Sequence, residues 1–436
     1  MRVASLIGHS REVLREIVAN PQRPVDLFLS RYFRGKRYLG GKDRRFISEQ
    51  VYDTLRQFLR YYFLLTNHDY SPTNESVDSS TIADEILAAS IVESESSTNF
   101  DELSEGTRLT IERLHEISDR LQSIPLAIAH LSENDRLAFH TSLPRWFVQQ
   151  IVEDFPSDYQ AILYSLARGG EIAIRANRLK GSREELSFKL YRQGISTTFS
   201  EFAPEGLILE KRLNLSAIAE FRGGFFEVQD VGSQMLAPLL QPQPSWRVFD
   251  ACAGGGGKTL HLASLMEGRG QIVAHDLNSV RLENIVPRIE RSGVANIELL
   301  DHSQYLRNRS TLYNQFDALL IDAPCTGTGT IRRNPGMRLT LDRGVLQKAV
   351  VEQAEILAEY SALVKPGGVM LYATCSLLRA ENEDQVKIFL ERNHNWEIKP
   401  VEIAPSLSTS EGFYRSFPHI HSTDGFFGAV LRRKSS

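Results

Sequence analysis

Two cysteines are the residues with the clearest capacity for chemistry. Cys325 lies in IDAPCTGTG and Cys375 in YATCSL, and each follows a short apolar run typical of a buried strand. A thiolate in a polar loop is a strong nucleophile, suited to attack on an electrophilic ring carbon. The alternative is that each cysteine is a small core residue, which is the usual role of an isolated one. Their shared place just after a strand favours the chemical interpretation.

A glycine-rich turn lies between a predicted strand and a predicted helix in VFDACAGGGGKT, residues 248–259. Glycine permits positive φ and close approach of a ligand, and a helix N-terminus offers free N–H groups. A P-loop is one interpretation, but Cys252 stands where its first glycine belongs. A dinucleotide fingerprint needs glycine or alanine where Thr259 stands. The third interpretation is a nucleoside-containing cofactor such as S-adenosylmethionine, with candidate residues Cys252, Ala253, Gly254, Gly255, Gly256, Gly257 and Lys258.

Three aspartates end predicted strands near these motifs: Asp276, Asp301 and Asp322. Asp276 ends the strand after the glycine turn, where a carboxylate can bind ribose hydroxyls. Any one of the three alone is more simply a helix N-cap. Because the carboxyl ends of parallel strands share one rim, we expect all three near the cofactor.

The elements that must position these residues begin near residue 170, where short apolar runs alternate with helical segments. This pattern predicts an α/β fold with a parallel sheet covered on both faces and its ligand at the carboxyl ends of the strands. The predicted strands are 172–178, 247–253, 271–276, 297–301, 316–324, 369–375 and 426–433, and the predicted helices are 258–266, 279–292, 344–364 and 381–393.

The N-terminal part has helical periodicity and a strong charge asymmetry. Residues 1–64 carry 13 Lys and Arg against 6 Asp and Glu, whereas residues 65–139 carry 4 against 15. The basic block can bind phosphates, or it can be an ordinary solvated surface. Residues 71–108 are rich in Ser, Thr, Asp and Glu, so we expect a loosely ordered acidic insertion with one short helix at 82–92.

Composition excludes several classes of protein. The 436 residues are 42% hydrophobic and carry a net charge of −4, which is ordinary for a globular chain. No apolar run approaches the roughly 18 residues of a membrane helix, and the N-terminus lacks the apolar core of a secretory signal. Three cysteines are too few for a disulfide framework, and an odd number leaves at least one unpaired. We therefore expect a cytoplasmic protein without a metal, most simply a monomer.

The motifs together resemble the cytosine-5 RNA methyltransferases of the NOL/NOP/Sun family, over roughly residues 140–433. Besides the two cysteine motifs and the glycine turn, the matching segments are R-x-N-x-L-K at 175–180, VQDVGSQ at 228–234, IRRNP at 331–335, ENE at 381–383 and DGFFGAVL at 424–431. The N-terminal KDRRFISEQVYDTLR resembles the helical NusB-like domain of the bacterial members that modify 16S rRNA.

This resemblance implies three domains. Residues 1–140 would be a helical NusB-like RNA-binding domain with the acidic insertion at about 71–108, and residues 145–235 a small α/β RNA-binding module. Residues 236–436 would be a Rossmann-like methyltransferase domain with a mixed, mostly parallel seven-stranded sheet. We expect the part after residue 140 to fold and to bind cofactor without the helical domain.

The resemblance also implies site roles. Cys375 would add to cytosine C6, and Cys325 would assist loss of the C5 proton and release of the adduct. Asp322 would face N3 and the exocyclic amine, and Lys258 would lower a thiol pKa. S-adenosylmethionine would be the cofactor, and RNA, with 16S rRNA the expected one, would be the substrate. RNA contacts are expected from Arg175, Asn177, Lys180 and Arg332.

The sequence departs from the family pattern at two places. Gly254-Gly255 replace the usual Ala-Pro of the glycine turn, and Gly336 and Leu339 stand where an acid and a tryptophan often follow Arg-Arg-Asn-Pro. The first change predicts a more flexible turn, and the second predicts altered RNA contacts.

A tRNA cytosine-5 methyltransferase and a non-catalytic ribosome-assembly factor stay as alternatives.

Overall fold

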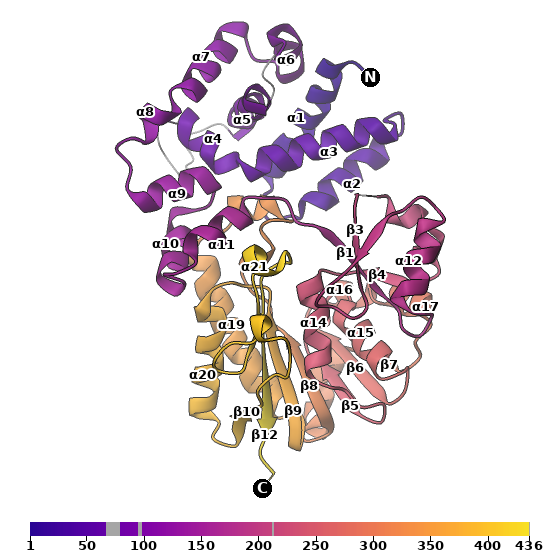
Figure 1. The fold of residues 1–436 in the computed structure, drawn as a ribbon. Helices are drawn as coiled ribbons and strands as arrows, with labels where there is room; N and C mark the ends of the chain where they lie inside the picture. The colour runs from indigo at the N-terminus through magenta and orange to yellow at the C-terminus, as the bar shows by residue number, and fades with distance from the viewer. Residues whose placement is uncertain (67–78, 95–97, 212, 436) are drawn as a thin grey trace. The chain divides into compact units, whose positions relative to one another are not determined.

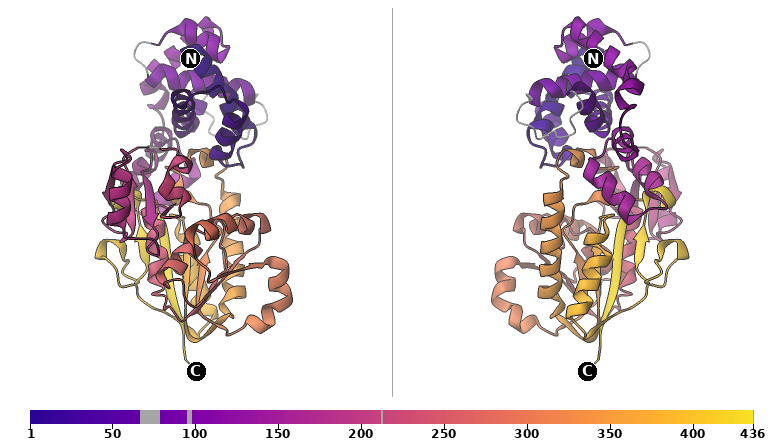
Figure 2. Two further views of the ribbon diagram at one scale, coloured as in Figure 1. Left: turned by 90° about the vertical axis from the view of Figure 1, so that its right-hand side faces the viewer. Right: turned by 90° about the vertical axis from the view of Figure 1, so that its left-hand side faces the viewer.

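The computed structural model describes residues 1–66, 79–94, 98–211 and 213–435, and it divides into two compact units. The helical unit comprises Met1–Gly169 and Ile331–Arg343, and the sheet unit comprises Gly170–Thr330 and Gly344–Ser436 (Figures 1 and 2). Within the described ranges, no helix is both long and apolar enough to cross a membrane.

The helical unit confirms the predicted all-α N-terminal region. Capping explains several of the starts, because Ser132 accepts a hydrogen bond at the first turn of α9 and Asn99 does so for α6. The helices are α1 (Val3–Ala19), α2 (Val25–Gly35), α3 (Gly41–Arg56), α4 (Phe58–Leu65), α5 (Ser79–Ser94), α6 (Phe100–Thr107), α7 (Ile111–Gln122), α8 (Ile124–Ile128), α9 (Glu133–Thr141), α10 (Arg145–Asp154) and α11 (Tyr159–Leu166).

The acidic stretch contains a core helix, so the prediction of loose order is wrong for most of it. Helix α5 buries Ile82, Ile86 and Leu87 completely or nearly so in the core of the helical unit. Its Asp84 is also buried, where it forms ion pairs with Arg11 and Arg15 of α1. The helix predicted at 82–92 is confirmed, and it is longer than predicted because it spans Ser79–Ser94. Residues 71–78 and 95–97 lie outside the described residues.

The segment Ile331–Arg343 packs into the helical unit although it lies far along the chain. Leu339 joins the core of α1–α7, and the buried Arg338 donates hydrogen bonds to the carbonyls of Ser142, Ile331 and Leu166. Burial lowers the pKa of Arg338 to about 9. Without residues 1–140, Leu339 would lose this core, whereas Arg338 would keep its three carbonyl partners. That the chain after residue 140 folds and binds cofactor without the helical domain stays a prediction.

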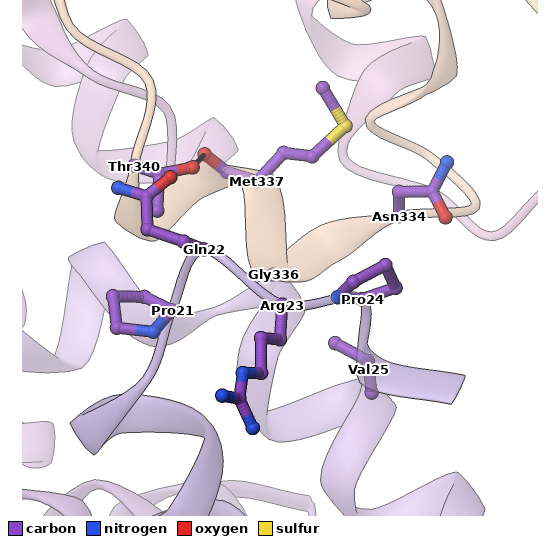
Figure 3. Close-up of a pocket in the computed structure, with 9 residues that line it drawn as sticks. All are labelled: Pro21, Gln22, Arg23, Pro24, Val25, Asn334, Gly336, Met337 and Thr340. Carbon is purple, nitrogen blue, oxygen red and sulfur yellow. Dashed lines mark hydrogen bonds between the residues drawn. The ribbon is translucent and has the colours of Figure 1, made fainter. Parts of the chain in front are cut away.

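A pocket of about 280 Å³ lies where this segment meets the turn between α1 and α2 (Figure 3). Gly336 forms part of its wall, and a Cβ at this position would lie 2.8 Å from Cγ2 of Val25. Close packing against α2 thus explains glycine at a position where the family often has an acid.

The sheet unit begins with a small antiparallel sheet in the order β2-β3-β1-β4. Its strands are β1 (Ile172–Ala176), β2 (Thr197–Phe199), β3 (Gly206–Leu209) and β4 (Phe226–Val228), with α12 (Arg183–Tyr191) and α13 (Ala219–Arg222) between them. Ser182 and Glu185 form a capping box at the start of α12. The core of this sheet contains Ile174, Leu190, Leu207 and Phe226.

The large sheet follows the order β10-β12-β9-β8-β5-β6-β7, and β11 also pairs with β12. It thus has eight strands rather than seven, and the predicted strands lack the three-residue β10 and β11. The five strands from β9 to β7 are parallel, and β12 is antiparallel to its neighbours. The strands are β5 (Arg247–Asp250), β6 (Gln271–Asp276), β7 (Ile297–Asp301), β8 (Phe316–Asp322), β9 (Val364–Thr374), β10 (Trp396–Ile398), β11 (Tyr414–Ser416) and β12 (Phe426–Arg433).

Helices cover both faces of the large sheet, as predicted for a parallel sheet. One face packs against α14 (Val231–Leu239) and α15 (Gly257–Leu265), and the other against α18 (His302–Leu312), α19 (Arg343–Ser361) and α20 (Glu383–Arg392). The predicted helix 279–292 is two helices, α16 (Ser279–Glu283) and α17 (Val286–Ser292), with Pro287 in the first turn of the second. The strand order reverses between β5 and β8, which is where α/β sheets bind ligands.

Candidate active site

The two cysteines face each other at the carboxyl ends of neighbouring strands. Cys325 follows β8 and Cys375 follows β9, and their Sγ atoms are 3.4 Å apart. The hydrogen bond to Cys375 raises the pKa of the Cys325 thiol well above its usual value, with burial adding to the effect. Either sulfur can donate the hydrogen bond between them, and the raised pKa keeps Cys325 protonated.

An ion pair lies on the same rim. Lys258 in the first turn of α15 contacts Asp322 at the end of β8, with Nζ and Oδ2 2.5 Å apart. The Lys258 ammonium also lies 5.8 Å from the ring centroid of Phe426. The structure thus brings Lys258 and Asp322 together, whereas the influence of Lys258 on a thiol stays a prediction.

The glycine turn has the backbone that its sequence predicts. Gly254 and Gly256 have φ of 53° and 80°, in the region that favours glycine. A Cβ at Gly256 would lie 2.8 Å from Ile285, whereas a Cβ at Gly254 would meet nothing nearer than the Cys252 carbonyl oxygen at 4.0 Å. The turn is therefore packed on one side and open on the other, and Gly257 starts α15 beside it.

The aspartates of the rim differ in their partners. Asp276 accepts hydrogen bonds from the backbone N–H groups of Gly254 and Asn278, so it ties the end of β6 to the glycine turn. Asp301 pairs with Asp276 in the strand register and caps α18 through the N–H of Gln304. Its hydrogen bond from Ser303 is the main cause that lowers the pKa of Asp301. Asp301 is thus an N-cap in this structure, and its contact with a cofactor stays a prediction.

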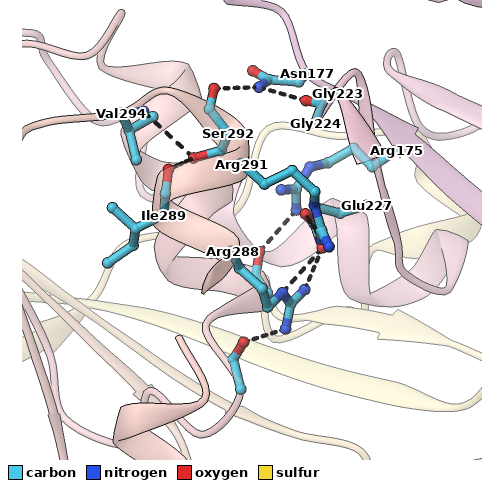
Figure 4. A network of polar contacts seen from close by, with 12 residues as sticks. Arg175, Asn177, Gly223, Gly224, Glu227, Arg288, Ile289, Arg291, Ser292 and Val294 are labelled. Carbon is cyan, nitrogen blue, oxygen red and sulfur yellow. Dashed lines mark hydrogen bonds and ion pairs between the residues drawn. The ribbon is translucent and has the colours of Figure 1, made fainter. Parts of the chain in front are cut away.

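Two arginines hold the glycine turn through its carbonyl oxygens (Figure 4). Arg288 of α17 donates to the carbonyl of Gly255 and, at 2.7 and 3.0 Å, to Oε2 of the buried Glu227 on β4. Arg291 reaches the other oxygen of Glu227. From β1, Arg175 donates to the Gly257 carbonyl at 2.9 Å and to the side chain of Gln229. The small sheet therefore contacts the turn directly through Arg175 and indirectly through Glu227, which holds Arg288.

The side chains expected to contact RNA are engaged inside the protein. Asn177 donates to the carbonyls of Gly224 and Ser292, and Lys180 donates to those of Gly223 and Arg291. Arg175 is buried, which lowers its pKa to about 10. Asn177 and Lys180 thus join the small sheet to α17, and the RNA contacts of all three residues stay predictions. Arg332 lies in the helical unit and donates to the Gly169 carbonyl.

The remaining residues of the turn have mainly packing roles here. Cys252 packs against the core on the α18–α20 face, and burial raises the pKa of its thiol well above the usual value. Ala253 packs against Leu282 and Ile285. Sequence reasoning missed Asp250, whose buried carboxyl accepts a hydrogen bond from Thr259, as well as Arg288 and Glu227. Arginine-to-carbonyl contacts of this kind leave no local sequence signal.

The residues present fit a nucleoside-containing cofactor. The open side of Gly254 allows close backbone approach, and the Asp276 carboxylate, which has more acceptor sites than the two used, lies directly beside it. Among the described residues, no group of three His, Cys, Asp or Glu side chains is arranged to hold a metal ion.

Comparison with known proteins gives the family. The family described as "16S rRNA methyltransferase RsmB/F" matches residues 237–432, and a ferredoxin-like domain of the same proteins matches residues 143–216. A probable ribosomal RNA small subunit methyltransferase B from Synechocystis is 32% identical over 298 residues, which are 67% of this chain and 67% of the relative. The chain belongs to the NOL/NOP/Sun family of RNA methyltransferases. This excludes the P-loop and dinucleotide-binding interpretations of the glycine turn.

One further relative and two solved structures are also similar to this chain. A 26S rRNA (cytosine-C(5))-methyltransferase, nsun-1, from Caenorhabditis elegans is 32% identical over 61% of this chain and 42% of its own. A solved structure named PH0851 matches 99% of both chains at 26% identity with a TM-score of 0.82. A methyltransferase homologue from Pyrococcus horikoshii matches 70% of this chain and all of its own, at 28% identity and a TM-score of 0.60.

Proposed function

We propose that this enzyme methylates C5 of a cytosine in small-subunit ribosomal RNA, with S-adenosylmethionine as methyl donor. The observation that carries the proposal is the Cys325–Cys375 pair, with 3.4 Å between its sulfurs, at the ends of two neighbouring strands of the same sheet. Cytosine C5 is a weak nucleophile, and addition of a thiolate to C6 activates it by splitting one hard step into easier ones. The names of the relatives support ribosomal RNA over tRNA.

The glycine turn and Asp276 would hold the cofactor, the turn through its backbone and Asp276 through ribose hydroxyls. When bound, S-adenosylmethionine supplies an electrophilic methyl group. The Arg288 and Arg175 contacts to the Gly255 and Gly257 carbonyls keep the turn in one conformation. They offset the freedom that Gly254-Gly255 introduce where the family usually has Ala-Pro.

Cys375 acts as the nucleophile. Its thiolate forms a bond to C6 of the cytosine, and the electron pair that this frees at C5 takes up the methyl group. Asp322 accepts a hydrogen bond from the base edge, and its ion pair with Lys258 holds it in place. The target base must leave its stack to reach the rim, which costs a few kcal/mol and less in a looped RNA.

Cys325 acts after methyl transfer. In the free enzyme the hydrogen bond with Cys375 is the main cause that raises the pKa of Cys325. Once Cys375 is bonded to C6 that contribution is gone, so Cys325 can lose its proton to solvent and become a base. It then takes the C5 proton, the C6–S bond breaks, and the Cys325 thiol donates a hydrogen bond to the departing Cys375 thiolate.

A non-catalytic assembly factor is the second candidate, and the paired thiols beside an ion pair argue against it. The test uses the full-length protein, radiolabelled S-adenosylmethionine and ribosomal RNA from cells that lack the enzyme. We expect label in the small-subunit RNA and one protected cytosine by bisulfite mapping. Label in tRNA alone would show that tRNA, and not ribosomal RNA, is the substrate. No label in any RNA would overturn the enzymatic proposal.

A further inference from the structure

The loops that carry the two cysteines converge on one buried side chain, Glu381. Its Oε1 accepts a hydrogen bond at 2.8 Å from the backbone N–H of Thr326, the residue after Cys325. Its Oε2 accepts from the hydroxyl of Thr326 and from that of Ser376, the residue after Cys375. A single fully buried carboxyl group thus contacts the next residue of each cysteine loop.

Further contacts fix Glu381 and its neighbour. Gln353 of α19 donates both to Glu381 Oε1 at 3.0 Å and to the Pro324 carbonyl at 2.8 Å. The hydroxyl of Tyr372 donates to the Glu381 carbonyl, and the Asn382 side chain donates to the carbonyl of Ser376. Glu381 is therefore held from β9 and α19 and cannot follow a loop that moves.

The two loops also touch directly. The N–H of Gly329 donates to the Cys375 carbonyl at 2.9 Å, and the N–H of Leu377 donates to the Thr328 hydroxyl. The Ser376 hydroxyl lies 3.1 Å from that of Thr328 and 3.3 Å from that of Thr326. Glu381 anchors this group of contacts, because its carboxyl bonds both Thr326 and Ser376 and is itself held by Gln353 of α19.

We propose that Glu381 is a positioning residue of the two-cysteine site, whose carboxyl group sets the distance between the Cys325 and Cys375 sulfurs. The inference rests on the proposed function for its catalytic meaning, but the distance itself can be measured without RNA. To bond both loops, the side chain at position 381 needs the length and the hydrogen-bonding atoms of Glu381, but it does not need the negative charge. A glutamine in place of Glu381 would accept from the Thr326 N–H and donate to the two hydroxyls, which can rotate to accept.

The test uses phenylarsine oxide on the full-length protein. Its arsenic atom forms one bond to each of two neighbouring thiols with release of water, so its affinity reports sulfurs held close together. The variants are Glu381→Asp, which keeps the charge but loses one methylene of reach, and Glu381→Gln, which keeps the reach but loses the charge. Glu359→Ala on α19 is the matched control, because Glu359 bonds Tyr305 and lies outside the cysteine loops. Cys375→Ala gives the baseline for a site with one thiol.

We expect Glu381→Asp to weaken arsenical affinity about tenfold or more, the effect of a lost buried hydrogen bond. Glu381→Gln and Glu359→Ala should bind as wild type does. In methylation assays Glu381→Asp should lower kcat with little change in KM for S-adenosylmethionine, and Glu381→Gln should restore it.

Wild-type arsenical affinity in Glu381→Asp would overturn the proposal, as would a loss in Glu381→Gln equal to that in Glu381→Asp. Should Glu381→Asp fail to fold, Ser376→Ala removes the hydroxyl of one loop and must show the same loss. The expected arsenical pattern without methylation by wild type would leave Glu381 as a positioning residue and would reject the proposed function instead.

Discussion

The two halves of the candidate site are held in different ways. At the cysteine rim, one buried carboxyl group accepts hydrogen bonds from the loops that carry both sulfurs. At the glycine turn, arginines from outside the turn donate to its carbonyl oxygens. The contacts at the rim include the side chains of Thr326 and Ser376, so its geometry depends on the residue types of the cysteine loops. The contacts at the turn are made to backbone carbonyls, which every residue has, so its geometry depends on the arginines of α17 and the small sheet.

This difference predicts a division of labour between the halves. The rim should govern the covalent chemistry, and the turn and its arginines should govern cofactor affinity. Changes at one half should therefore leave the property of the other nearly intact, and the variants below test that separation.

The largest effect is expected for Cys375→Ala. Loss of the nucleophile should abolish methylation, because no other thiol can add to C6 in its place. Calorimetry should show S-adenosylmethionine binding close to that of wild type, since the thiol contacts the base and not the cofactor. Substantial turnover by this variant would exclude Cys375 as the nucleophile.

Cys325→Ala should keep the first step and lose the last. The C6–S bond would form, but elimination would lack its base, so a protein–RNA adduct should accumulate that survives denaturing electrophoresis. Wild type should show little adduct, and the double variant Cys325→Ala/Cys375→Ala none. If Cys325 only packs, no band will appear with competent RNA and S-adenosylmethionine.

Arg288→Ala tests the other half. Loss of the contact to the Gly255 carbonyl should free the turn and weaken S-adenosylmethionine binding by about 1–2 kcal/mol, measured by calorimetry. Arg291→Ala is the matched control, because Arg291 also bonds Glu227 and its side-chain hydrogen bonds to described residues do not reach the turn. The adduct trapped by Cys325→Ala should still form in the Arg288→Ala background at saturating cofactor. Equal losses in the two arginine variants would assign the effect to Glu227 rather than to the turn.

The last prediction concerns a pH dependence of stability from Asp250, which lies at the end of β5. Burial raises the pKa of Asp250 to about 7. Because the folded state binds this proton more tightly than the unfolded state, the stability it contributes is full below the ordinary pKa of an aspartate. It is lost as pH rises through about 7, at up to about 1.4 kcal/mol per pH unit. In Asp250→Asn, the urea concentration at the unfolding midpoint should change less between pH 5 and pH 7 than in wild type. The same change with pH in both proteins would contradict the assignment.

Much of the sheet unit is predictable because its strands are continuous apolar runs and its turn is glycine-rich. The pairing of Cys325 with Cys375 followed from their places after strands, since parallel strand ends share a rim. Glu381 was visible only as part of a motif, because nothing local shows that it reaches two loops. Arg175, Asn177 and Lys180 matched a motif whose RNA role was inferred, yet their side chains bond backbone carbonyls. Such contacts depend on tertiary structure, which periodicity does not contain.

The docking of residues 331–343 on the helical unit has a consequence for synthesis on the ribosome. The helical unit lacks Leu339 from its core, and Arg338 from its interior, until that segment has been translated about 160 residues after Gly169. At elongation rates of about 5–20 residues/s the wait is about 8 to 30 s, during which an incomplete core is exposed to other nascent chains and to proteases. The N-terminal helices therefore emerge first but mature only once most of the methyltransferase sequence has followed them.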